Sequence, residues 1–513
     1  MKLSKSVMFG AAACLLSTSA SAQAAGDLLA LSQYNYSFST ARSAALGGAF
    51  TSLGADLSSM SINPAGLGMY MSSDFGISPS LTWNNMQSTY LGTKSDYSRT
   101  RFTLGNLGMA FNLYQGSGTL TSFTLGVGYS KLADFNTTSA AYGQGIDKSI
   151  TDVLAEYMNG VPLSSLGHPD NDPYQPFRRA DVGLWGGILA YQTGILDPMS
   201  DAQDNKQYTV ANNLATGSRT NPSMRNVNKG SIDEYSISGG FNIQNILYLG
   251  FTIGIQDILY RNDNYYAETY DNNSLPLNGM NYIRSLHLDG TGVNFKFGAV
   301  VRPVENLRIG VAVHTPTLVS INEEYIEWMS ADYKNTARGE LLDSPRSLNE
   351  YDINTPTRLL TGISYTLPGV GLITADYERV WYNRMKLRNM GTENWDFQQT
   401  INNEVSSFYQ PANNFRVGIE ATPAQNFYIR AGYANYGECI ATRDAFNNMS
   451  SINSYENYSA GLGFRFQNMY VDLAYIYTEY KYAPYTMFYY GDPDYVVTKQ
   501  SRNTITMSVG VRF

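Results

Sequence analysis

The chain has 513 residues, 15% of them charged, and a formal net charge of −8. Soluble domains usually carry about 25% charged residues, and the acidic balance leaves no basic surface for nucleic acid. No stretch after the N-terminal leader has the roughly 20 consecutive apolar residues of a membrane-spanning helix, whereas tyrosine and glycine are abundant, at 40 and 46 residues. The composition excludes a helical membrane protein and favours strands.

Residues 1–22 predict a signal peptide. They combine a charged start, an apolar centre over 7–16 and the small-residue triplet Ala20-Ser21-Ala22, which is the usual order in a secretory leader. The protein is therefore expected to be exported, with a mature chain that begins at Gln23.

Cysteine chemistry is expected to play no part in the mature protein. A lipoprotein alternative rests on Cys14, but Ala11 stands where such signals normally have leucine, and cleavage after the leader would remove Cys14. Cys439 is then the only cysteine left, so neither an intramolecular disulfide nor a cysteine-based metal site can form.

The segment 23–72 predicts a compact plug, here called the hatch, ahead of the first strand. It is rich in small residues, including Gly47 and Gly48, which allow close packing and unusual backbone angles. Asn63 followed by Pro64 predicts an extended residue and a bend. A segment of this kind can fill the inside of a barrel.

Residues 73–513 predict an all-β transmembrane antiparallel barrel. About 14 runs show the period-two alternation of half-buried strands. In the run 249–256, for example, Leu, Phe, Ile and Ile alternate with Gly, Thr, Gly and Gln. The strands are expected at 73–84, 101–114, 120–135, 232–243, 247–266, 286–302, 307–323, 357–367, 372–387, 414–422, 427–436, 458–466, 469–482 and 502–513.

The connections between these strands alternate between short and long. A barrel sorts its loops in this way when one rim faces the periplasm and the other faces outside. In hydrocarbon each unpaired backbone amide costs several kcal/mol, so the sheet must close on itself. A lone soluble sheet could show the same alternation, but it would not explain the export signal. The short turns are expected at 115–118, 244–246, 303–306, 368–371, 423–426 and 467–468.

Two glycines in the third predicted strand suggest a kink. Gly126 and Gly128 flank a single valine, and glycine inside a strand often marks a bend or a close backbone approach. A kink there would open a side window in the wall. The alternative is that inward-facing glycine is simply common in barrels.

The longest predicted extracellular loop, 136–231, contains two helical patterns. Leu154, Tyr157 and Met158 follow helical spacing, as do Trp185 and Leu189. One interpretation is an apolar groove above the barrel where a lipid-like molecule first docks. The other is that these faces cover one another and the barrel rim, which is the commoner fate of an amphipathic face.

Charged residues within the strands are expected to face the lumen and to pair there. Buried charges persist only when they are paired, so we expect an ion-pair network that holds the hatch rather than a polar ion pathway. The residues concerned are Lys296, Asp376, Glu378, Arg416, Glu420, Arg430, Arg465 and Asp472. Tyrosines over 260–270 and 477–495 are expected to form an interfacial girdle, with sugar or protein binding as the alternative.

No catalytic or metal site is expected. The three histidines, His168, His287 and His314, have no serine, carboxylate and oxyanion arrangement that the sequence can connect. The chain also has no histidine cluster or acidic repeat that would hold a metal. We therefore expect a protein that is not an enzyme and needs no cofactor.

The last predicted strand, 502–513, indicates insertion into an outer membrane. Its odd positions from Ile505 onward are apolar, and it ends on Phe513. Outer-membrane barrels present such a terminal strand to the barrel-assembly machinery and use it to join the last strand to the first. The machinery is therefore an expected partner during biogenesis.

The hatch sequence resembles that of a known family. The stretch ARSAALGGAFTSLGADLSSMSINPAGLGMY contains Gly47-Gly48-Ala49 followed by Asn63-Pro64-Ala65, and it is similar to the N-terminal hatch of the FadL-type outer-membrane transporters of long-chain fatty acids and other hydrophobic compounds. The resemblance implies a barrel plugged by the hatch and a hydrophobic small molecule captured by the outer loops. It also implies passage past a moved hatch, or sideways through an opening near a kinked strand.

The resemblance leaves a second function open. Some relatives in the Bacteroidota group keep the barrel and hatch but shuttle or anchor secreted proteins, or attach to barrel-assembly machinery, so the fold does not fix the function. The expected location in both cases is the outer membrane of a Gram-negative bacterium, in contact with its lipid. The partner would be a hydrophobic small molecule in the first case and an outer-membrane protein in the second.

Overall fold

The computed structural model describes residues 26–166, 172–210, 218–271, 276–334, 340–391, 394–441, 454–482, 484–488 and 494–513. The predicted signal peptide, with Cys14, and His168 lie outside the described residues.

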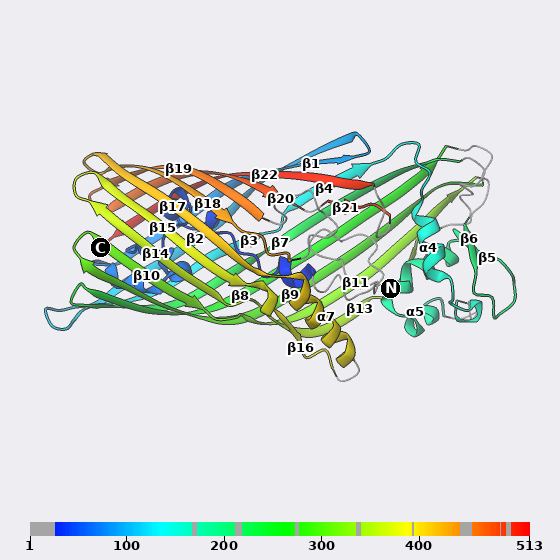
Figure 1. The fold of residues 1–513 in the computed structure, drawn as a ribbon, viewed down its shortest axis with the longest axis horizontal. Helices are drawn as coiled ribbons and strands as arrows, with labels where there is room; N and C mark the ends of the chain where they lie inside the picture. Colours follow the sequence, from blue (N-terminus) through cyan, green and yellow to red (C-terminus); the bar gives the residue numbers. More distant parts are fainter. Residues whose placement is uncertain are drawn as a thin grey trace.

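The described strands form one closed antiparallel barrel (Figure 1). Fourteen strands make the wall, and the last pairs with the first from Asp74↔Arg512 to Thr89↔Val497. The predicted fold class is confirmed. The wall strands are β1 (Asp74–Tyr90), β2 (Thr93–Gln115), β3 (Leu120–Asp134), β7 (Thr220–Ile243), β8 (Leu247–Tyr270), β9 (Leu277–Val304), β10 (Leu307–His314), β14 (Arg358–Leu367), β15 (Gly371–Trp381), β17 (Pro411–Ala424), β18 (Phe427–Tyr436), β19 (Ser454–Phe466), β20 (Met469–Lys481) and β22 (Tyr495–Arg512).

Further strands continue the wall beyond the level of these pairings. They are β4 (Thr137–Tyr142), β11 (Leu318–Tyr333), β12 (Leu342–Asp343), β13 (Ser347–Asn354), β16 (Lys386–Arg388) and β21 (Tyr485–Thr486). A separate two-stranded ribbon joins β5 (Leu196–Pro198) to β6 (Tyr208–Val210).

Most strands are longer than predicted at the end away from the tight turns. The strand expected at 101–114 runs over Thr93–Gln115, and the one expected at 286–302 runs over Leu277–Val304. The backbone ladder continues where the outward side chains become polar, so hydrophobic alternation underestimates strand length. The loop predicted at 136–231 is accordingly shorter, because β4 pairs with the start of β7.

Two predicted strands are interrupted. The one at 307–323 divides into β10 and β11 around Pro316, which has no N–H to donate to the ladder. The one at 372–387 divides into β15 and β16 at a single 3-10 turn, η6 (Tyr382–Arg384).

The outer surface of the barrel carries an apolar band. On β8, Leu249, Phe251, Ile253 and Ile255 are between 37% and 44% exposed, while the residues between them face inward. Each Å² of this surface costs about 25 cal/mol in water, a cost that lipid removes. Within the described part of the chain, no helix is both long and apolar enough to cross a membrane.

The girdle prediction for the tyrosines over 260–270 and 477–495 is met at some positions and not at others. Tyr477 lies on the outward face of β20, with its ring 6.4 Å from that of the exposed Tyr458, whereas Tyr480 packs against the luminal Arg502. Tyr260 and Tyr266 are buried, because even positions of β8 point into the lumen. The girdle prediction is wrong for these residues.

Short helices gather at the outer end of the barrel (Figure 1). They are α4 (Ile150–Met158), α5 (Gln175–Arg179) and α6 (Trp185–Gln192), with the 3-10 turns η3 (Leu163–Ser165) and η4 (Val182–Leu184). Glu268 of β8 anchors the start of α4, because its carboxylate accepts hydrogen bonds from the Ser149 hydroxyl at 2.5 Å and the Ile150 amide at 2.6 Å. The hydroxyls of Tyr266 and Tyr270 also donate to this carboxylate.

The structure contains one helix in a segment that the sequence analysis treated as a loop between strands. This helix, α7 (Trp395–Phe408), lies between β16 and β17 and buries Ile401, Val405 and Phe408. Their spacing is that of one helical face, so the sequence did contain the signal.

Candidate functional site in the barrel lumen

The hatch lies inside the barrel throughout its described part, 26–72 (Figure 1). Its only exposed residue in that range is Met71. It folds into η1 (Tyr36–Phe38), α2 (Ala41–Ala45), α3 (Ser59–Ile62) and η2 (Pro64–Met69). Hydrogen bonds tie it to opposite sides of the wall, from Ala41 to Ser508 of β22 and from Thr252 of β8 to Met60.

The Asn63-Pro64-Ala65 triplet fixes the bend of the hatch. The Asn63 side chain accepts from the Ala65 amide at 3.1 Å and donates to the Thr51 carbonyl at 2.6 Å, which caps η2 at the residue before its proline. A side-chain carbon at Gly298 of β9 would overlap the Asn63 amide. The wall therefore has a space of this shape opposite the motif.

Gly47 and Gly48 both adopt left-handed backbone angles, with φ of +67° and +75°. These angles are costly for residues with a side chain. A carbon added at Gly47 would also come within 3.0 Å of the Tyr433 backbone. The two glycines let the hatch reverse direction directly against β18.

Many of the wall positions that the hatch touches are glycines. At each of them a side-chain carbon would run into a hatch atom, so wall and hatch approach more closely than any other residue would allow. The wall positions are Gly76, Gly105, Gly108, Gly126, Gly128, Gly240, Gly250, Gly298, Gly310, Gly362, Gly418, Gly432 and Gly461. We call this set the glycine ring.

The predicted kink residues belong to this contact surface. A carbon at Gly126 would lie 2.8 Å from the Met60 sulfur and one at Gly128 2.6 Å from the Met60 methyl. The pairing of β3 with β2 and with β7 runs through both glycines without a register shift. Gly126 and Gly128 therefore receive a hatch side chain and do not mark a break in the strand.

The break lies further along β3. Pairing between β2 and β3 ends at Asn106↔Ser130. From Thr93 to Gly105, β1 is the only described strand that pairs with β2. A register shift against β7 follows between Lys131 and Ala133.

Beyond this point β3 lies on the luminal side of β2 and β1. The Asp134 carbonyl accepts from Arg502 of β22 at 3.0 Å, and the Asn136 carbonyl accepts from the Asn84 side chain of β1 at 2.9 Å. Further on, the hydroxyls of Tyr97 and Tyr142 are 2.9 Å apart. We call this overlap of β2 with the chain from Leu132 to Tyr142 the seam.

The hatch also closes the seam. The Asn35 amide of the hatch donates to the Leu132 carbonyl at 2.8 Å, in place of the missing β2 partner. The Arg502 guanidinium is 4% exposed and lies over the rings of Phe38 and Tyr480. The strand alternation could have identified Arg502 as a luminal charge, but no sequence pattern marked the seam.

The predicted luminal charges form a buried network around the hatch. Glu378 binds Arg358 at 3.3 Å and Arg416 at 3.1 Å. Asp376 accepts from the amide and the hydroxyl of Thr51 in the hatch, at 2.8 and 2.6 Å. The remaining pairs are Arg430 with Glu420 and Asp472, Arg465 with Asp472, Lys296 with Glu234, and Arg42 of the hatch with Glu420. The prediction of a pairing network is confirmed.

The start of the hatch fills an apolar chamber above this network. Leu28, Leu29 and Leu31 are at most 2% exposed and pack among apolar residues from the wall and from α7. The chamber residues are Leu132, Ile232, Ile258, Leu286, Leu288, Val319, Ile321, Ile353, Val380, Ile401 and Val405.

The predicted loop residues come together, but as a packed cluster. Leu154, Met158, Trp185 and Leu189 are at most 5% exposed, and Tyr157 packs against the same cluster. Strand-end residues such as Tyr266 and Met329 complete it. These faces cover one another and the rim, so a docking groove at this place would require α4 and α6 to separate.

The described histidines have structural surroundings. His314 is buried, with its Nε2 2.9 Å from the Ile62 carbonyl of the hatch, and His287 lies 3.3 Å from Asp289. Among the described residues, no group of three or more histidine, cysteine or acidic side chains could hold a metal.

Comparison with known proteins identifies the fold. No family model matches the sequence, and no curated protein matches it. The P. putida toluene transporter TodX superposes with a TM-score of 0.53 at 13% identity, over 94% of this chain and 99% of the other. A Pseudomonas aeruginosa FadL homologue gives 0.53 at 12% identity, over 94% and 98%. At these identities the likeness is one of fold, and the chain has the fold of the FadL-type outer-membrane transporters.

Proposed function

We propose that this protein carries small hydrophobic molecules through the outer membrane of a Gram-negative bacterium. The observation that carries the proposal is the seam, a stretch of wall that is closed by side chains and by the hatch instead of by a strand ladder. The solved structures with this fold include the toluene transporter TodX, a mutant of which is described as a monoaromatic hydrocarbon channel. Toluene is of the ligand class proposed here.

The distribution of polarity in the lumen favours a sideways route. The lower lumen is filled by the hatch and its ion pairs, where an apolar molecule would have to displace paired charges at a cost of several kcal/mol. The chamber around Leu28, Leu29 and Leu31 is apolar and lies on the same side of the network as Asn35 and the seam. A hydrophobe that replaces these leucines gains about 25 cal/mol per Å² of its own apolar surface removed from water, less the same cost per Å² for the leucine surface that its binding exposes.

Movement of the first part of the hatch would then couple entry to exit. Displacing the leucines also pulls on Asn35, which closes the seam through the Leu132 carbonyl. Loss of that single hydrogen bond costs about 0.5–1.5 kcal/mol, which is small enough for ligand binding to supply. The molecule would leave into the outer leaflet between β2 and β3, and the ion-paired part of the hatch would stay in place.

Uptake by whole cells tests the proposal. A host without transporters of this class, expressing the protein, is expected to take up labelled toluene or a labelled long-chain fatty acid faster than the host alone, whereas uptake of a small sugar stays unchanged. Folded protein in the outer membrane with no gain for either hydrophobe would contradict transport. Comparison of the two substrates gives the ligand class.

The docking function has one observation in its favour, because the hatch and the loop cluster together fill both ends of the lumen. A docking protein would be purified with a stoichiometric protein partner, and a transporter with a hydrophobic small molecule that mass spectrometry detects. Recovery of an empty barrel with a bound protein would favour docking.

A further inference from the structure

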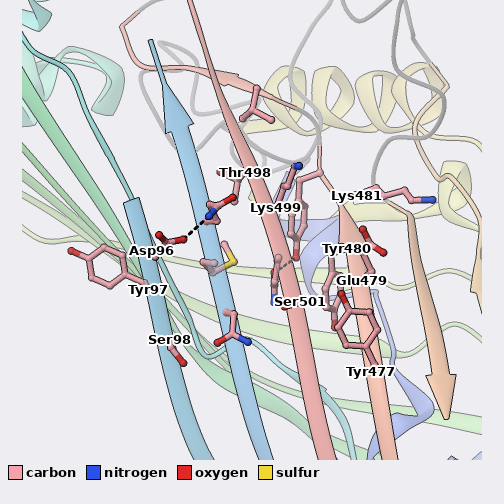
Figure 2. A pocket seen from close by; sticks show the side chains of 16 residues that line it. Asp96, Tyr97, Ser98, Tyr477, Glu479, Tyr480, Lys481, Thr498, Lys499 and Ser501 are labelled. Carbon is pink, nitrogen blue, oxygen red and sulfur yellow. Dashed lines mark hydrogen bonds between the residues drawn. The ribbon is translucent and has the colours of Figure 1, made fainter. Parts of the chain in front are cut away.

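A cavity lined by both polar and apolar groups lies on the barrel wall at the outer end of β1, β2, β20 and β22 (Figure 2). Its volume is about 800 Å³. The outward-facing side chains that line it include those of Asn85, Gln87, Asp96, Ser98, Glu479, Lys481 and Lys499, together with Tyr477, Val497 and Ser501. It lies outside the hatch and the loop cluster.

The cavity begins where the outer surface changes from apolar to polar. Below it, the outward residues Leu81, Phe102, Tyr475 and Ile505 are between 36% and 73% exposed. Lys499 is the third outward position above Ile505 on β22, six residues earlier in the chain. With about 3.3 Å per residue and a strand tilt of about 40°, this separation is roughly 15 Å along the membrane normal. Lipid headgroups and their first sugars occupy this level in an outer leaflet.

Two lysines directly oppose each other across the strands at this level. Lys481 pairs with Lys499 in the ladder between β20 and β22, and like charges in that position destabilise a sheet. Lys481 is partly compensated by Glu456 at 2.7 Å, whereas Lys499 is exposed. A bound anion between the two ammonium groups would remove the repulsion.

The other side chains have the chemistry of a sugar site. Asp96 accepts from the Gln87 amide at 2.8 Å and keeps a second carboxylate oxygen, and Glu479 adds another carboxylate. Such groups repel a bare phosphate but accept hydrogen bonds from sugar hydroxyls. Tyr477 offers the face of a ring at the lower edge. A ligand that carries both phosphate and hydroxyl groups satisfies the whole set.

We propose that this cavity binds the phosphorylated sugar headgroup of a lipopolysaccharide molecule in the outer leaflet. Lys481 and Lys499 hold the phosphate, Asp96 and Glu479 bind sugar hydroxyls, and the acyl chains lie along Leu81 and Ile505 below. No residue of the cavity belongs to the hatch, but Asp96, Tyr97 and Ser98 lie on the stretch of β2 that forms the seam. The proposal does not depend on transport, because lipopolysaccharide binding is measured on the purified protein without any transported molecule.

Binding to purified protein tests this site. Detergent-purified full-length protein is stripped of lipid and titrated with lipopolysaccharide, and the bound lipid is counted by native mass spectrometry. The variant Lys481→Gln with Lys499→Gln is expected to weaken binding by about tenfold or more, since each lysine near an anionic lipid surface contributes measurably. Lys206→Gln removes an exposed loop lysine away from the cavity and is expected to leave binding unchanged.

Further ligands separate the sources of affinity. Dephosphorylated lipopolysaccharide should bind the unaltered protein as weakly as intact lipopolysaccharide binds the lysine variant. Phosphatidylglycerol and inorganic phosphate should bind more weakly than lipopolysaccharide, because they lack the sugars that Asp96 and Glu479 recognise. Unchanged lipopolysaccharide binding in the double variant, or equal binding of phosphatidylglycerol, would overturn the assignment.

Discussion

Replacement of Glu378 by glutamine is expected to unseat the hatch. The carboxylate pairs with two guanidinium groups, those of Arg358 and Arg416, and all three side chains are at most 3% exposed. Glutamine keeps the shape but turns an amide NH₂ toward these donors and leaves two buried cations unpaired. Arg358 also binds the Ser32 carbonyl of the hatch at 2.5 Å. Water can therefore reach the unpaired cations only if the hatch moves.

The size of the effect follows from the loss of a buried partner. Removal of one member of a buried ion pair costs about 3–5 kcal/mol. If displacement of the hatch relieves that cost, the equilibrium between seated and displaced hatch shifts by roughly two to three and a half powers of ten, at about 1.4 kcal/mol for each tenfold change. The wall itself is retained, because β15 pairs through its backbone with β14 and β17.

Liposome swelling with small sugars measures this shift. The Glu378→Gln variant is expected to swell liposomes much faster than the unaltered protein, with unchanged heat-modifiable mobility on gels as evidence of a closed barrel. Glu305→Gln is the matched control. Glu305 lies in a tight turn, its side chain is 89% exposed, and its ion pair with Arg302 is long, at 3.9 Å, so this substitution should leave the swelling rate unchanged. Equal swelling rates for folded Glu378→Gln and unaltered protein would refute the argument.

Three further outcomes are expected. The double variant Tyr97→Cys with Tyr142→Cys, cross-linked by a short bifunctional thiol reagent, should hold the seam closed and abolish hydrophobe uptake. Each single cysteine variant is the control, and undiminished uptake after cross-linking would exclude this exit. Deletion of Phe513, whose backbone exchanges hydrogen bonds with Ser73 at 2.9 and 3.0 Å, should reduce the amount of folded barrel in the membrane, and a normal yield of heat-modifiable protein would argue against its part in insertion. Burial raises the pKa of the Glu268 carboxyl, although the hydrogen bonds that it accepts from Ser149, Tyr266 and Ile150 oppose the shift. The group lies above the apolar band, and its ionisation costs more there than in the unfolded chain, so the fold around the start of α4 is most stable below the ordinary carboxyl pKa and loses part of that stability as pH rises through the raised value. Hydrogen exchange of α4 amides, corrected for intrinsic rates, should therefore quicken with pH in the unaltered protein and lose this dependence in Glu268→Gln.

The sequence predicted the barrel because each membrane-spanning strand has one face toward lipid and one toward the lumen, and this two-sided environment leaves a period-two pattern of side chains in the sequence. On strands with outward apolar positions the polar positions between them face inward, so charges such as Glu378 and Arg416 could be placed in the lumen and expected to pair. The Asn-Pro-Ala motif of the hatch was recognisable for a similar reason, since its conformation is local. The lengths of the strands were underestimated because backbone pairing continues beyond the apolar band.

The seam could not be predicted in the same way. Whether β2 pairs with β3 beyond Ser130 depends on where the next strand lies, and neither strand's own pattern records it. Gly126 and Gly128 drew attention to the correct strand for a different physical reason, the bulk of Met60. The loop helices were predicted, but their surroundings were not, because an amphipathic face indicates that a helix side is buried and does not indicate which residues or ligand bury it.

The glycine ring has a mechanical consequence. Asn63 and Met60 of the hatch occupy gaps where wall glycines have no side chains, so movement of the hatch along the axis would drive these side chains against neighbouring wall residues. Polar attachments such as Thr51 to Asp376 and Arg42 to Glu420 add to this resistance. The same architecture could thus be made looser or tighter in related barrels by exchanging a few attachments while the shape of the bore stays the same.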